Sequence, residues 1–281
     1  MSKLPKRRII VEFMTNRGKL KQIEGINIKF SVQSMCYAYG SQANIELCNL
    51  AMDDISYLTT YLSPFFGMRT RKQVTLFCGY DDNVKQIFSG DIWTATPVKR
   101  GGDISLQIKA IKSFFSSSNI ASKTIAGPKI TVKDACSQVA SWGGLGFSWL
   151  AKSQKTIDTF TYTGSLVEAL SKLSQLDDII VYEEDDQLKV IDKNPQGLGV
   201  RELSAKTGLI GMPRLNHFGC EVKTLIDHTV KLGSTIILNS ELCPSANGSY
   251  WVYSAIHQGS LREQQFYSTF KCRRGGQIWT N

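Results

Sequence analysis

The histidine and cysteine side chains are the first candidates for chemistry in this chain, because they are common metal ligands. The three histidines are His217, His228 and His257, and no two of them have the short spacing of a metal-binding pair. No Cys-x-x-Cys pair assists them among the seven cysteines, which are Cys36, Cys48, Cys78, Cys136, Cys220, Cys243 and Cys272. We therefore expect no metal site, and we interpret the cysteines as free thiols of a reducing compartment, several of them buried.

Carboxylates and glycine-rich stretches also lack the context that catalysis or cofactor binding needs. Acidic residues occur at Asp53–Asp54, Asp177–Asp178 and Glu183–Asp186, at expected helix ends and in an expected turn. A glycosidase-like pair could be drawn from them, but nothing marks two as buried together. Gly143–Gly146 follows an expected helix, whereas a dinucleotide loop precedes one, and Gly164–Leu166 lacks the Gly-x-Ser-x-Gly pattern. We expect no catalytic residue and no cofactor, so the protein is predicted not to be an enzyme.

Composition indicates an ordinary folded protein with an excess of positive charge. The 281 residues are 42% hydrophobic and 20% charged, and the net charge is +9. The basic residues form short clusters at Lys6–Arg8, Arg69–Lys72, Lys99–Arg100 and Arg273–Arg274, without a long run. This pattern favours solvated or interface charge over nucleic-acid readout. We expect neither a signal peptide nor a membrane helix, and hence synthesis in a cytoplasm without stable membrane association.

Aromatic residues are a weaker sign of nucleic-acid binding. Trp93, Trp142 and Trp251 suit core or interface packing. A stacking platform for single strands would interleave aromatic and basic residues along one sheet face, and "YWVYSAIHQGSLR" (residues 250–262) comes closest to that pattern.

The N-terminal part is predicted to consist mostly of strands, which would position its side chains. Period-two alternation predicts strands at "RRIIVEF", "GINIKFSV", "ANIELCNL" and "VTLFCGY". A hairpin is expected over Ile87–Ile111, with its turn at Lys99–Gly102. One helix is expected near residues 54–62, capped by Asp53 or Asp54 and ended by Pro64. Residues 1–112 therefore read as a β-rich domain with one helix.

The middle of the chain, residues 113–195, has helical periodicity and reads as a small α/β domain. Thr131 and Asp134 predict the start of one helix, and Ser165 with Glu168 predicts a capping box at the start of another. "GFSWL" is expected as a short strand, and "IIVYEEDDQLKVID" as a hairpin with an acidic tip at Glu183–Asp186. The second helix carries a leucine stripe that should be buried, formed by Leu166, Leu170, Leu173 and Leu176.

The C-terminal part, residues 196–281, is β-rich again. Four strands are predicted at "GCEVKTLI", "STIILNS", "SYWVYSAIHQG" and "QQFYSTFKC". The predicted class is α+β, with two β-barrel-like domains flanking a small α/β domain. Residues 74–111 and 235–272 share one strand-turn order over 38 residues each, which predicts a structural duplication.

The order of several short motifs resembles that of phage tail baseplate hub proteins of the contractile-tail type. The C-terminal part carries "GLIGMP" at Gly208–Pro213, a Leu232-Gly233 lead-in, "TIIL", "GSYWVYSAIHQG" and a final aromatic strand. The earlier "IFSGDIWTA", "TVKDACSQVA" and "TGSLVEALSKLSQ" resemble the same family in the same order. The resemblance covers nearly the whole chain, although each motif is short.

This resemblance implies a structural role. Hub proteins of this family look like trimers in which each chain gives two tube-type β domains, so that a pseudo-six-fold ring adapts the hexameric tail tube to the trimeric spike. Implied partners are the tail tube protein or a tube initiator, the spike, the tape-measure protein and the baseplate wedges, with DNA passing transiently. The implied location is the virion tail baseplate, assembled in the host cytoplasm.

Other readings stay open from the sequence, and the same resemblance would also suit a related, phage-like injection machine. A nucleic-acid-binding protein with barrel-like domains would use the positive charge and the aromatic strands, and a hydrolase would use the carboxylates. The terminal segments "SKLPKRR" and "RRGGQIWTN" are either contact arms or disordered ends.

Overall fold

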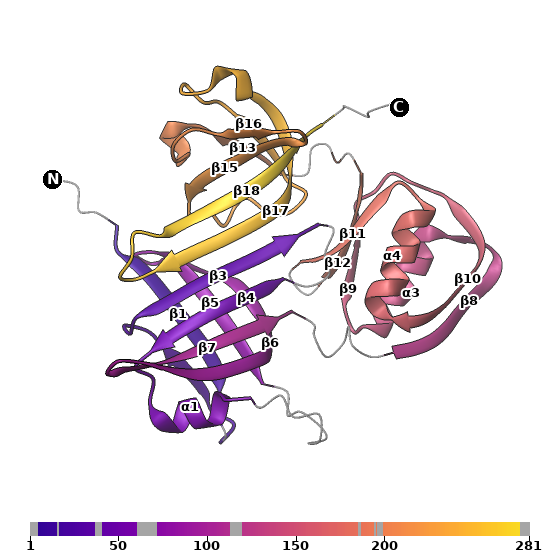
Figure 1. Ribbon diagram of the computed structural model, residues 1–281. Helices are drawn as coiled ribbons and strands as arrows, with labels where there is room; N and C mark the ends of the chain where they lie inside the picture. The colour runs from indigo at the N-terminus through magenta and orange to yellow at the C-terminus, as the bar shows by residue number, and fades with distance from the viewer. Residues whose placement is uncertain are drawn as a thin grey trace.

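Strands dominate the structure, as the alternation of apolar residues requires. A computed structural model describes residues 5–15, 17–36, 41–60, 72–112, 120–184, 187–193, 195 and 199–275. Figure 1 shows a first unit in indigo to magenta, a middle unit in pink at the side, and a third unit in orange to yellow. Helices are concentrated in the middle unit, which confirms the predicted α+β class.

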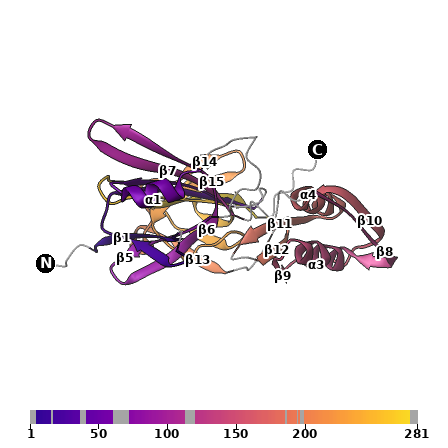
Figure 2. The same cartoon turned by 90° about the horizontal axis from the view of Figure 1, so that it is seen from below.

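The first unit (residues 5–112) is a two-layered β structure joined by one long strand. Its elements are β1 (Arg7–Met14), β2 (Leu20–Ile23), β3 (Ile28–Met35), β4 (Gln42–Cys48), α1 (Met52–Leu58), β5 (Gln73–Tyr80), β6 (Asn83–Arg100) and β7 (Asp103–Ile111). The first part of β6 pairs with β5 in one layer, and residues from Asp91 onward pair with β7 in the other. The predicted hairpin of β6 and β7 projects from the unit (Figure 2). Phe13, Phe30, Leu76 and Leu106 lie in the core between the layers.

The third unit (residues 199–275) is built in the same way. Its strands are β13 (Val200–Leu203), β14 (Arg214–Asn216), β15 (Gly219–Leu225), β16 (Thr235–Leu238), β17 (Gly248–Ser260) and β18 (Phe266–Arg274). The long strand β17 pairs with β16 through residues 248–251 and with β18 along most of its length. A second core, which includes Trp251 and Phe270, fills this unit.

The two β units share one strand order. Their hydrogen-bonded neighbours follow the order β1-β5-β6-β7-β4-β3 in the first unit and β13-β16-β17-β18-β15-β14 in the third. Residues 74–111 and 235–272, which the sequence predicts to be duplicated, are therefore antiparallel three-stranded meanders. Their strands, β5-β6-β7 and β16-β17-β18, have the same order and direction. One pairing differs, because β13 runs parallel to β16 whereas β1 runs antiparallel to β5.

Each long strand also has a bulge beside an aromatic residue. The register of β6 against β7 shifts between Ile92 and Thr94, and that of β17 against β18 shifts between Val252 and Ser254. The residues left between them are Trp93 and Tyr253. A bulge bends its strand and increases the twist, so both long strands can turn from one layer into the other at the same place.

The middle unit packs two helices against short sheets. Its elements are β8 (Ile120–Thr131), α3 (Val132–Trp142), β9 (Gly146–Trp149), β10 (Thr156–Ser165), α4 (Leu166–Leu176), β11 (Ile179–Glu184) and β12 (Gln187–Asp192). Both predicted helix starts are confirmed: the Thr131 hydroxyl accepts from the Asp134 amide at 3.1 Å, and Ser165 and Glu168 form a capping box. Strands β8 and β10 were not predicted from sequence. Within the described residues, no helix is long and apolar enough to cross a membrane.

Two helix predictions were wrong in detail. No side chain caps α1, which begins after Ala51, and Asp54 instead forms an ion pair with Lys21. The helix ends at Leu58 because the chain turns at Thr59 and Thr60 bridges to Ala95 of β6; Leu62 and Pro64 lie outside the described residues. In α4, Leu166, Leu170 and Leu173 are buried as predicted, but Leu176 is 38% exposed because it is the last residue of the helix.

The predicted acidic tip was also wrong for Glu183 and Glu184. Both belong to strand β11, and Glu183 is buried with its carboxylate 4.0 Å from the Lys112 ammonium. Glu184 accepts from Lys189 at 2.8 Å and from the Leu232 amide at 3.2 Å. Asp185 and Asp186 lie outside the described residues. The glutamates therefore help to join the middle unit to its neighbours instead of solubilising a turn.

A polar cavity of about 120 Å³ lies where the three units meet. His228, His257, Lys112 and Glu184 are among its lining residues. His257 Nδ1 lies 2.8 Å from the Ser268 hydroxyl. Burial, with a smaller contribution from His228, lowers the pKa of His257 to about 4, and burial is also the main cause of a lowered pKa at His228. The fold thus brings together two histidines that are 29 positions apart in sequence, and it lowers the pKa of both.

This burial makes stability depend on pH. An unfolded histidine titrates near 6.5, so between about pH 6.5 and pH 4 the unfolded chain binds a proton that folded His257 refuses. Folding stability should fall as the pH is lowered through this window, by up to roughly 3 kcal/mol from this residue. Urea unfolding measured at several pH values gives the slope of the unfolding free energy against pH. In this window the slope should be shallower for His257→Gln than for the wild type, whereas His217→Gln, at an exposed site, should keep the wild-type slope. Equal slopes for all three proteins would contradict the role of His257 burial in the pH dependence.

Candidate functional site: the polar face of a continuous sheet

The main candidate for function is a surface formed by one continuous sheet. Strand β3 of the first unit pairs antiparallel with β17 of the third through seven residue pairs, from Ser254–Met35 to Ser260–Lys29. Eight strands are thereby hydrogen-bonded in the order β14-β15-β18-β17-β3-β4-β7-β6. Figure 1 shows β18, β17, β3 and β4 side by side across the boundary between the units.

Alternation gives the two sides of this sheet opposite character. One row across the strands is buried and consists of Phe266, Gly259, Phe30, Ile45, Ile108 and Ala95. A Cβ on Gly259 would lie 2.5 Å from the Phe30 ring, so this position needs glycine for the two units to approach. The adjacent row is solvent-facing and consists of Leu225, Tyr267, Gln258, Ser31, Asn44, Lys109 and Thr94.

We call the side that carries this second row the polar face, and its charge is unbalanced. On this side, the strands from β15 to β7 carry two acidic residues, Glu46 and Glu221. Arg100 and Asp103 at the tip of the β6–β7 hairpin are opposite each other in register and are left out of this comparison. Five basic residues lie on the same side: Lys29, Lys109, Lys223, Lys271 and Arg273. Some of this charge is locally engaged, since Lys223 lies 3.5 Å from the Tyr267 ring centre. The face is therefore polar and mildly basic.

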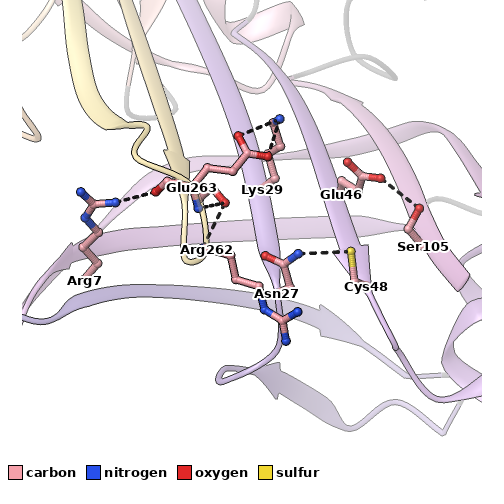
Figure 3. A network of polar contacts seen from close by, with 9 residues as sticks. Arg7, Asn27, Lys29, Glu46, Cys48, Ser105, Arg262 and Glu263 are labelled. Atoms are coloured by element: carbon pink, nitrogen blue, oxygen red, sulfur yellow. Dashed lines mark hydrogen bonds and ion pairs between the residues drawn. The ribbon is translucent and has the colours of Figure 1, made fainter. Parts of the chain in front are cut away.

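A polar network ties the tip of the β17–β18 hairpin to the first unit. Arg7 donates to the Glu263 carbonyl at 2.8 Å, and Lys29 pairs with the Glu263 carboxylate at 2.9 Å (Figure 3). The Arg7 guanidinium also lies 5.3 Å from the Phe266 ring, which packs edge-on against Tyr80. Exposed ion pairs of this kind stabilise weakly, so the network fixes the hairpin's position while the buried row supplies most of the energy.

Among the described residues, the carboxylates of Asp177, Asp178 and Glu183 do not form a catalytic pair. Asp178 is held by Lys193 at 2.7 Å, and the hydrogen bond from Lys193 lowers its pKa. Glu24 likewise has a lowered pKa because Arg8 donates to it. Asp177–Asp178 precede β11 and Glu183 lies near its other end, which separates them by roughly five residues of extended chain, about 16 Å. These acids serve as ion-pair partners rather than as proton donors.

The other candidate groups are structural as well. All seven cysteines are free thiols and five are buried; burial raises the pKa of Cys136 to about 12 and also raises that of Cys36 and Cys78. No group of three or more His, Cys, Asp or Glu side chains in the described part of the chain could hold a metal ion. Gly143 closes α3 through its amide, and Gly164 lies against the Glu168 carboxylate of the capping box.

The suggested stacking platform at residues 250–262 was wrong. Tyr250 and Trp251 are 2% and 1% exposed because this part of β17 faces the core of the third unit. Trp142 stacks on Tyr162 inside the middle unit, whereas Trp93 is 40% exposed at its bulge. The polar face depends on which strands pair across the units, and strand alternation alone does not reveal those pairs.

Solved structures share this fold at low sequence identity. The 43 kDa tail protein of prophage MuSo2 from Shewanella oneidensis is 9% identical, with a TM-score of 0.69 over 96% of this chain and 97% of that one. The tail protein from Neisseria meningitidis MC58 is 9% identical, with a TM-score of 0.66 and the same coverage. The c3393 protein of Escherichia coli, a component of the type VI secretion system, is 10% identical, with a TM-score of 0.62 over 89% and 74%.

No curated protein sequence matches the chain. A family model does match it: the one described as "Baseplate hub gp41" aligns with residues 8–272. This match spans both β units and the middle unit, and it confirms the resemblance inferred from the motif order. The chain therefore belongs to the baseplate hub gp41 family.

Proposed function

We propose that three copies of this chain form the structural hub of a phage tail baseplate. The observation that carries the proposal is the strand order shared by the first and third units. Two similar units in each of three chains would give six similar positions around a ring, which suits a six-fold tube on one side and a three-fold spike on the other. Residues 1–112 and 196–281 would be the tube-type domains, and residues 113–195 would lie on the flank.

The polar face suits the inner wall of such a ring. A wall that lets DNA slide needs a wetted surface without strong or sequence-specific contacts, and the row from Leu225 to Thr94 is mostly amide, hydroxyl and ammonium groups. The implied partners are the tube protein or its initiator, the spike, the tape-measure protein and the baseplate wedges. The hub would assemble in the host cytoplasm and carry no enzymatic activity of its own.

The proposed ring predicts the oligomeric state. Light scattering on the purified chain at micromolar concentration should give the mass of a trimer, because ring closure covers strand edges that a monomer leaves unpaired. Addition of the spike protein should stabilise this species. A monomer that stays monomeric with the spike present would contradict the proposal.

DNA binding separates a conduit from a nucleic-acid-binding protein. Double- and single-stranded DNA should bind more weakly than about 10⁻⁶ M at physiological salt, with no sequence preference, and lowering the salt should strengthen the retention. Lys109→Gln should weaken this low-salt binding, whereas Lys193→Gln, off the polar face, should leave it unchanged. Tight binding that persists at physiological salt would favour the nucleic-acid-binding alternative instead.

A further inference from the structure

The junction between β3 and β17 within one chain can be compared with the strand edges that two copies of the chain would bring together. In the shared strand order, β3 corresponds to β14 and β17 corresponds to β6. Within one chain β17 pairs with β3, but the equivalent pairing of β6 with β14 does not occur. The part of β6 after Asp91, which no longer pairs with β5, lies at the opposite edge of these eight strands from β14. The two edges are therefore complementary to each other on different copies, in a head-to-tail arrangement that can close into a ring.

Three large apolar side chains are exposed on β14 or next to it in sequence, and we call Met212, Leu215 and Phe218 the apolar cluster. Their exposed fractions are 63%, 52% and 64%. Several large apolar side chains that are exposed together on one edge indicate a contact surface. The corresponding edge of the first unit, β3, is covered by β17, and its core takes in Phe266 and Ile226 of the third unit. By the same geometry, the cluster at β14 would be covered by the strand equivalent to β17, which is β6 of another copy.

The opposite edge, residues 94–100 of β6, can accept only limited main-chain pairing. At Ala95 the edge is occupied by Thr60, whose amide donates to the Ala95 carbonyl at 3.1 Å. Two residues further on, on the same side, Pro97 has no amide hydrogen to donate. The partly exposed Trp93 lies next to this edge. Side-chain packing must therefore supply most of the contact here.

We infer that β14 and the apolar cluster of one copy dock against residues 93–100 of β6 in a second copy. This inference rests on the proposed ring and names the surfaces that would close it. The intermolecular ladder could involve at most the three residues of β14, against seven pairs at the β3–β17 junction. The junction between copies should thus be the weaker of the two, so that the ring dissociates on dilution while each chain stays folded.

Aspartate substitutions in the cluster test this surface. Leu215→Asp and Phe218→Asp should each raise the concentration of half-association by roughly tenfold or more, because an apolar anchor is lost and a charge is buried. Leu242→Asp is the matched control, since Leu242 is 70% exposed and lies outside the cluster. Sedimentation over a dilution series reports association, and circular dichroism melts of the dissociated chains, expected to be equal, report folding.

Cysteine pairing tests which edges meet. The double variant Asn216→Cys with Thr96→Cys should form disulfides between copies and give covalent dimers and trimers on denaturing gels, whereas either single variant should stay monomeric. A wild-type trimer that Leu215→Asp and Phe218→Asp leave intact, and that the double variant does not cross-link, would overturn this interface and leave the ring standing. A wild-type chain that never associates would overturn the ring itself.

Discussion

The pairing of strand edges is the constraint on which this structure depends. A sheet edge presents main-chain donors and acceptors that must find partners or water, and a long unpartnered edge invites aggregation. The chain covers one such edge internally, by laying β17 of the third unit along β3 of the first. The proposed inner wall depends on that junction, since it joins two separate β units into one continuous sheet with a buried side and a polar side.

Residues at the junction show how local chemistry supports this arrangement. Gly259 leaves room for the Phe30 ring, and the Phe30 and Phe266 side chains then lie in one core. At the far end of the same strand pair, Cys36 and Tyr182 contribute to the core of the third unit, so the middle unit is fixed to the same seam. His228 and His257 also lie in this region, and burial lowers the pKa of both side chains.

Predictions from the sequence are correct where contacts between residues close in sequence determine the local structure. The Ser165–Glu168 capping box and the alternation in β3, β4 and β7 are such cases. Predictions are wrong where contacts with distant segments determine where an element ends or which side chain is buried. Thr60 ends α1 early by bridging to β6, and Glu183 is buried because Lys112 of another unit lies beside it. The polar face itself could not be predicted, because its rows depend on the pairing of β17 with β3. The sequence contained both strands but no sign that they are partners.

Electron cryo-microscopy of the assembled hub would test the central claim most directly. The claim is that one continuous sheet, with its polar side inward, forms the wall of a conduit. The account predicts three copies around the axis, with Gln258, Ser31, Asn44 and Lys109 lining the central channel and β14 of each copy beside β6 of the next. A hub in which these four residues face outward, or in which β3 and β17 of one chain are separated, would contradict it.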